Sequence, residues 1–133
     1  MGSTTATMDG VVSEQDVRTA ALSLPETNEK SSYGMPGFRV RTKGFARLHE
    51  EPGVLVLWCA DVGEKEALIA SDPEKFFTTP HYDGYSTVLV RLVHIDQDEL
   101  LDLLTAAWRS RAPTRLVEQF DADGGSVGSW TSG

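Results

Sequence analysis

The sequence predicts an α+β domain in which one antiparallel sheet carries helices mainly on one of its faces. Short stretches with strand-type alternation are separated by turn residues, and segments with helically spaced apolar residues lie between them. With 133 residues, the chain is long enough to build one domain with its own core. We expect this domain to span residues 11–120, with flexible segments over residues 1–10 and over the Gly/Ser-rich residues 121–133.

The helices are marked by their caps and stops. Ser13, followed by acidic residues, starts a first helix that Pro25 ends. Asp96 caps the last long helix, and Trp108 belongs to the apolar stripe of that helix. Two shorter helices are expected over residues 64–71 and 115–120.

The first strands are expected to form a β-hairpin over residues 38–42 and 45–49. A two-residue turn would bring an apolar side chain opposite an arginine on one face of this hairpin. A three-residue turn, Thr42 to Gly44, pairs Phe38 with Leu48 instead and keeps the apolar side chains together. We therefore expect the three-residue turn.

Two further strands follow, over residues 54–59 and 86–93. The first of them is apolar on both faces, which predicts a central strand covered on both sides, or on one side by a second subunit through self-association. Cys59 lies in this strand and is the only cysteine of the chain, so no internal disulfide can form. We expect a buried, unreactive thiol.

The charge pattern points to an anion-binding surface. The chain has 20 acidic and 12 basic side chains and a net charge of −8, yet residues 31–49 contain no Asp or Glu. The predicted hairpin register places Arg39 across from Arg47, so one face of the hairpin gathers positive charge, and Arg91 could extend it. The candidate DNA contacts are Arg39, Arg41, Lys43, Arg47 and Arg91. The alternative is a solvated face with no ligand.

A second candidate is the loop from Thr79 to Tyr85, which is dense in aromatic and hydrogen-bonding groups. We favour a rigid connection whose polar groups are satisfied by the backbone. The alternative is a pocket for a small molecule or a protein segment, formed by Tyr33, Phe38, His81, Tyr82 and Tyr85. No reaction motif and no zinc-type spacing is present, so we expect neither an enzyme nor a metal or cofactor.

Three strings add a resemblance to a known family: SYGMPGFRV at residues 32–40, FFTTPHYDGYSTVLVRL at 76–92 and AWRSRAP at 107–113. In order and spacing they resemble the MmcQ/YjbR family of small bacterial proteins. The resemblance covers roughly residues 11–116. It implies a frataxin-like α+β fold and DNA binding by a hairpin-bearing surface, and it implies no catalytic residue or cofactor.

The sequence contains no secretory signal and no apolar run of transmembrane length, so a cytoplasmic protein is expected. The first functional hypothesis is weak, phosphate-directed DNA binding with little sequence specificity. The second hypothesis is a small-molecule or protein interaction module built around the aromatic loop.

Overall fold

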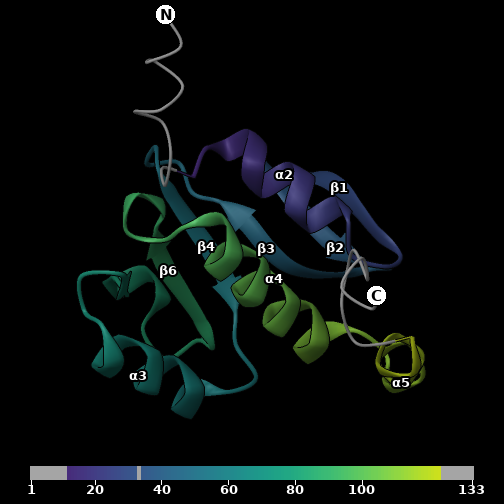
Figure 1. Cartoon of the computed structure of the whole chain (residues 1–133). Helices are drawn as coiled ribbons and strands as arrows, with labels where there is room; N and C mark the ends of the chain where they lie inside the picture. Colours follow the sequence, from purple (N-terminus) through teal and green to yellow (C-terminus); the bar gives the residue numbers. More distant parts are fainter. Residues whose placement is uncertain (1–11, 33, 124–133) are drawn as a thin grey trace, which may run out of the picture.

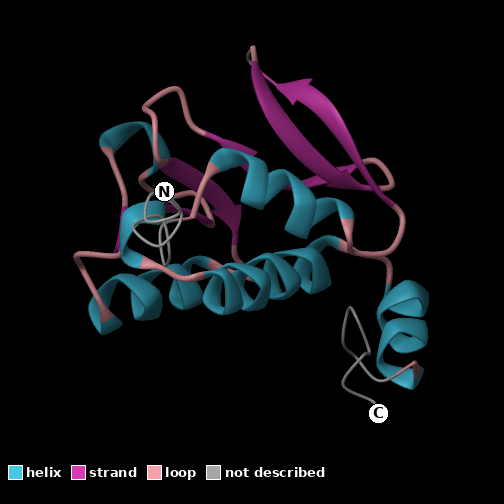
Figure 2. Cartoon of the chain, turned by 45° about the horizontal axis from the view of Figure 1, so that its top comes forward, coloured by secondary structure: helices cyan, strands magenta, loops and turns pink. Residues whose placement is uncertain are grey.

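The computed structural model describes residues 12–32 and 34–123, which form one six-stranded antiparallel sheet and four α-helices. The strands lie side by side in the order β1-β2-β3-β4-β6-β5. Figures 1 and 2 show the helices gathered on one side of this sheet, so the predicted fold class is confirmed. The strands are β1 (Thr27–Ser32), β2 (Met35–Val40), β3 (Lys43–Leu48), β4 (Val54–Trp58), β5 (Phe76–Phe77) and β6 (Thr87–Arg91). The helices are α2 (Glu14–Leu22), α3 (Val62–Ser71), α4 (Gln97–Arg111) and α5 (Thr114–Ala122).

The helix starts follow the predicted caps. At the start of α2, the Ser13 hydroxyl accepts from the Asp16 N–H, while the Asp16 carboxylate accepts from the Ser13 N–H, a reciprocal capping box. The Asp96 carboxylate accepts from the Glu99 N–H and starts α4. α5 continues to Ala122, two residues beyond the predicted domain end, and the rest of the predicted tail and residues 1–10 lie outside the described residues.

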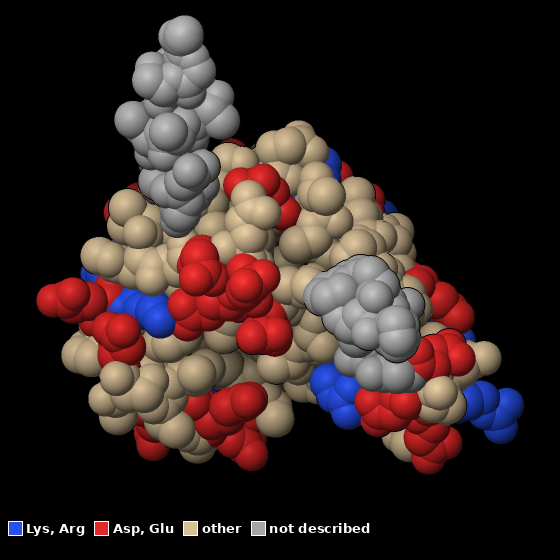
Figure 3. Space-filling model, in the orientation of Figure 1, with Lys and Arg blue, Asp and Glu red and all other residues tan. Residues whose placement is uncertain are grey.

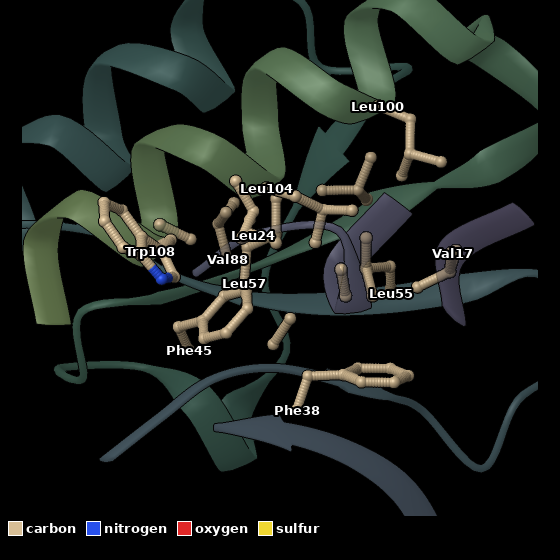
Figure 4. Close-up of a cluster of buried hydrophobic side chains, with 14 of the residues drawn as sticks. Val17, Leu24, Phe38, Phe45, Leu55, Leu57, Val88, Leu100, Leu104 and Trp108 are labelled. Atoms are coloured by element: carbon tan, nitrogen blue, oxygen red, sulfur yellow. The ribbon is translucent and has the colours of Figure 1, made fainter. Parts of the chain in front are cut away.

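The core lies between the sheet and α2, α3 and α4 (Figure 4). Trp108 is fully buried there, and its indole N–H donates to the Pro25 carbonyl at 3.0 Å. Phe120 of α5 packs against this ring, with 4.9 Å between the two centroids. Trp108 of α4 thus contacts both Phe120 of α5 and the segment that follows α2.

The hairpin between β2 and β3 differs from the prediction. The two-residue turn is Arg41-Thr42, and Arg41 has a φ of 55°, a left-handed conformation that its side chain stabilises by donating to the Glu26 carboxylate. Phe38 consequently pairs with Ala46 rather than with Leu48. The predicted three-residue turn over Thr42–Gly44 is therefore wrong.

A β-bulge keeps both arginines on one face of the sheet despite the different register. The pairing shifts by one residue between Phe38 and Arg39, and both Phe45 and Ala46 are buried in the core. The extra residue restores the alternation, so Arg47 returns to the sheet face that also carries Arg39. The predicted common face of the two arginines is correct although the predicted pairing is not.

The central position predicted for the third strand is confirmed, because β4 pairs with β3 on one side and β6 on the other. Its side chains on both faces are buried, with Leu55 0% exposed on one face and Val56 1% exposed on the other. The sequence did not predict β1, a polar strand at the sheet edge. None of the helices in the described part of the chain combines the length and apolar character needed to cross a bilayer.

The acidic side chains gather on the side of the molecule that the helices cover. Figure 3 shows them over α3 and α4, where Glu64, Glu66, Asp98 and Asp102 are exposed. The opposite sheet face can carry a different local potential, because at physiological salt the interaction of exposed charges fades beyond about 8 Å.

Candidate functional site

A hollow of about 740 Å³ lies on the sheet face opposite the helices, under the loop that joins β5 to β6. It brings together the two sets of residues that the sequence suggested separately, the basic hairpin and the aromatic loop. Its lining residues are Arg39, Thr42, Gly44, Arg47, Val56, Trp58, His81, Tyr82, Tyr85, Ser86 and Thr87. None of them is acidic.

Arg47 ties the two walls of this hollow together. It is 7% exposed, and its Nη2 donates to the Tyr82 hydroxyl of the aromatic loop. Its Nη1 donates to the Leu48 carbonyl at 3.3 Å and lies 3.6 Å from the Glu50 carboxylate. A guanidinium presents five donors in a fixed fork, so Arg47 can hold the loop and still offer positive charge to the hollow.

Arg39, unlike Arg47, has an unsatisfied guanidinium group. Among the described residues no group accepts a hydrogen bond from its side chain or forms an ion pair with it, and its Nε is buried without a partner. A buried cationic donor left without an acceptor is costly, typically about 1–3 kcal/mol or more. Arg39 and Arg47 also line the same acid-free hollow, where like charges repel. An anion bound between them would relieve both costs.

The aromatic wall is built on a tight turn. The Tyr85 N–H donates to the Tyr82 carbonyl at 3.1 Å, Asp83 has φ −62° and ψ 135°, and Gly84 has φ +85°, which together define a type II turn. Glycine is required at that third position because other residues are strained at positive φ. Two tyrosines are thereby placed at the ends of a single turn.

Lys65 of α3 forms hydrogen bonds to both ends of this turn. Lys65 is only 3% exposed, and its Nζ donates to the Tyr82 carbonyl at 2.6 Å and to the Tyr85 carbonyl at 2.9 Å. The buried ammonium thereby satisfies both ends of the turn. These two hydrogen bonds restrain the loop, and its aromatic side chains still line the hollow.

A smaller hollow of about 110 Å³ adjoins the large one and shares Arg39, Gly44, Arg47 and Trp58 with it. Its other lining residues are Lys30, Ser31, Gly37, Phe38 and Ala46, again without an acidic side chain. Trp58 stands where the two hollows meet, and the Arg111 guanidinium lies 5.8 Å from its ring centroid. Arg111 itself is anchored by donating from Nε to the Gly44 carbonyl at 2.9 Å.

The other predicted DNA contacts do not join the hollow. Arg41 forms an ion pair with Glu26 at 2.6 Å, and the exposed Lys43 begins β3 beside the turn. The Arg91 guanidinium stacks on Phe77, 4.0 Å from the ring centroid. The predicted basic surface of five cations is therefore divided between the hollow, the turn and the far end of β6.

Of the five predicted pocket residues, the structure brings His81, Tyr82 and Tyr85 together. Phe38 borders the smaller hollow, but it is fully buried and its ring belongs to the core (Figure 4). Tyr33 lies outside the described residues. Within the described part of the chain, no three metal-ligating side chains come together. Burial, more than any nearby charge, raises the pKa of the Cys59 thiol to about 12, so the thiol is protonated at neutral pH.

The sequence did not predict the roles of Trp58, Thr87 or Lys65. The face on which Trp58 lies could have been predicted from the sequence. Trp58 is two residues after Val56 on the same strand, so both lie on the face opposite Leu55 and Leu57. Thr87 pairs with Trp58 across the strands, and its buried hydroxyl has no hydrogen-bond partner within the described part of the chain. No local signal could identify Lys65, because its acceptors are carbonyls 17 and 20 residues away.

Comparison with known proteins places the chain in a family. A family model described as YjbR matches residues 22–110. The chain belongs to the YjbR family. This match confirms the family that the three sequence strings suggested, and it spans the sheet, α3 and most of α4.

Similar proteins share the family or the fold without assigning a ligand. Two relatives, the uncharacterised proteins Rv2570 of Mycobacterium tuberculosis and Mb2600 of Mycobacterium bovis, are each 52% identical over 66 residues, 50% of this chain and 51% of theirs. The chain thus spans about half the length of the curated relatives it matches. The crystal structure of Deinococcus radiodurans protein DR2400, a DUF419 domain, has a TM-score of 0.66, with 17% identity, 86% of this chain covered and 91% of that chain covered. At this identity the likeness concerns the fold.

Proposed function

We propose that this protein binds a small organic anion in the hollow between the β2–β3 hairpin and the aromatic loop. The observation that carries the proposal is Arg39, a partly buried cation without a carboxylate or hydrogen-bond acceptor among the described residues. Arginines in folded proteins are normally paired when they are buried. A cation kept unpaired in a hollow is an arrangement that a ligand would complete.

The surroundings of Arg39 favour an organic anion over a bare inorganic one. Trp58, Tyr82 and Tyr85 present aromatic surface to the same hollow, and Tyr85 is 65% exposed. Ligand sites commonly combine such apolar surface with a few polar groups that fix orientation. Because the walls exclude part of the water, a charge interaction here is stronger than on an open surface.

The test uses 8-anilinonaphthalene-1-sulfonate, an aromatic anion whose fluorescence rises on binding, as the probe. Replacing Arg39 by Gln should weaken its binding about 10- to 100-fold, since one charge-assisted interaction is lost. Lys43→Gln is the matched control, because it removes the same charge from an exposed residue of the same hairpin that does not line the hollow. Equal binding by both variants and the parent, or no binding by the parent, would contradict the proposal.

DNA binding through the hairpin is the second proposal, supported by the acid-free segment of residues 31–49. Arg41 and Arg91 are engaged by Glu26 and Phe77, which leaves Arg39 and Lys43 as the cations best able to reach phosphates. Two phosphate contacts predict a slope of about −2 for log K against log salt. Anisotropy titrations of labelled duplex DNA at low salt measure this slope, and Lys43→Gln should weaken DNA binding while leaving binding of the aromatic anion unchanged.

A further inference from the structure

The two adjoining hollows differ in size and in the groups that line them. The smaller, of about 110 Å³, has three cationic residues, Lys30, Arg39 and Arg47, on its walls. The larger, of about 740 Å³, adds the aromatic residues and hydroxyl groups. Both arginines and Trp58 belong to both hollows, so they are two compartments of one site.

From this division we infer that the ligand is a phosphate monoester with a flat aromatic ring. The phosphate group occupies the small compartment and the ring lies in the large one beside Trp58. This inference rests on the proposed function, that is, on anion binding at this site, and adds the chemical class of the ligand.

The charge of the small compartment favours phosphate over carboxylate. Three cationic residues and no acidic residue line it. A phosphate monoester carries about −1.5 to −2 charges at neutral pH, whereas a carboxylate carries one. The guanidinium fork of Arg39 matches the several oxygens of a phosphate. The Glu50 carboxylate, 3.6 Å from Arg47, offsets one of these three positive charges, and the two that remain exceed the single charge of a carboxylate.

Two structural features favour a compact head followed by a flat ring. Gly44 lines both compartments, and because it has no side chain, the sheet surface between them stays low. A Cβ at Gly44 would lie 3.9 Å from the Trp58 ring, so this bare stretch runs directly beside the indole. Thr87 is the cross-strand neighbour of Trp58, and its hydroxyl, which has no partner among the described residues, can bond to a polar ring edge. Aromatic rings stack favourably on an indole face or edge.

Isothermal titration at pH 7.5 with four probes tests each part of the inference. The probes are phenyl phosphate, benzoate, methyl phosphate and 8-anilinonaphthalene-1-sulfonate. Phenyl phosphate should bind at least about tenfold more tightly than benzoate, which has the same ring, and than methyl phosphate, which has the same head. Arg39→Lys keeps the charge but not the fork, and it should reduce the preference for phenyl phosphate over benzoate. Trp58→Leu should weaken phenyl phosphate and leave methyl phosphate unchanged.

The outcomes separate this inference from the proposed function. If benzoate binds as tightly as phenyl phosphate, the phosphate assignment is wrong, although an anion site exists. If phenyl and methyl phosphate bind equally, or if Trp58→Leu weakens both alike, the ring assignment is wrong. If the sulfonate binds and neither phosphate does, this inference fails while the proposed function stands. If no anion binds to the parent protein, both fail. Thermal unfolding of each variant shows that lost binding does not reflect a lost fold.

Discussion

Replacing Lys65 by Met tests how strongly one buried cation holds the aromatic loop. Its Nζ donates to two loop carbonyls at 2.6 and 2.9 Å, and the residue is 3% exposed. A hydrogen bond to a charged group contributes a net of about 1.5–3 kcal/mol, so two of them set an upper range of about 3–6 kcal/mol. Removing the ammonium also removes its own desolvation cost, and the surface turn can recover water. We expect the free energy of unfolding to fall by about 2–4 kcal/mol.

Urea denaturation followed by far-UV circular dichroism measures this change in unfolding free energy. Lys43→Met is the matched control, because Lys43 is exposed, and a surface substitution of this kind changes stability by only about 0.5 kcal/mol either way. The loosened turn should also weaken binding of 8-anilinonaphthalene-1-sulfonate, since Tyr82 and Tyr85 form part of the wall. If Lys65→Met is no more destabilising than Lys43→Met, the ammonium does not hold the loop and the reasoning is refuted.

Four further predictions concern the core, the turn, the thiol and an ion pair. Trp108→Ala should cost about 3–5 kcal/mol in a denaturant titration, and a near-neutral result would contradict its full burial. Gly84→Ala should cost about 1–2 kcal/mol by the same measurement, because the turn needs a positive φ while nothing lies within 4 Å of the new Cβ. Cys59 should resist Ellman's reagent at pH 8 until urea unfolds the protein, since burial raises its pKa to about 12. The hydrogen bond from Arg18, and then the charge of Arg18, lower the pKa of Glu29. This ion pair therefore stabilises the fold at pH values above the ordinary glutamate pKa, and the stabilisation is lost as the pH falls through the lowered pKa. In Glu29→Gln, the free energy of unfolding should depend less on pH in that acidic range, as denaturant titrations at several pH values would show.

The hairpin shows where prediction from the sequence ended. Alternation placed Arg39 and Arg47 on one face, because side-chain parity is a local property of extended backbone. The turn was wrong, because the left-handed conformation of Arg41 is stabilised by Glu26, a residue from before β1. The bulge was also invisible, since it depends on burying Phe45 and Ala46 against helices far along the chain.

The sequence by itself determined the starts of α2 and α4, the apolar core positions, the central third strand and the family, because caps, spacing and short strings are local signals. It also named both halves of the candidate site. Only the tertiary structure decided that they are one site, by folding the β5–β6 loop over the arginine face of the sheet. It likewise decided which cations are engaged. Arg41 pairs with Glu26, 15 residues away, and Arg91 donates to the Glu74 carbonyl, 17 residues away, whereas the side chain of Arg39 has no such partner among the described residues. Such pairings depend on distances between segments remote in sequence, and no local pattern encodes them.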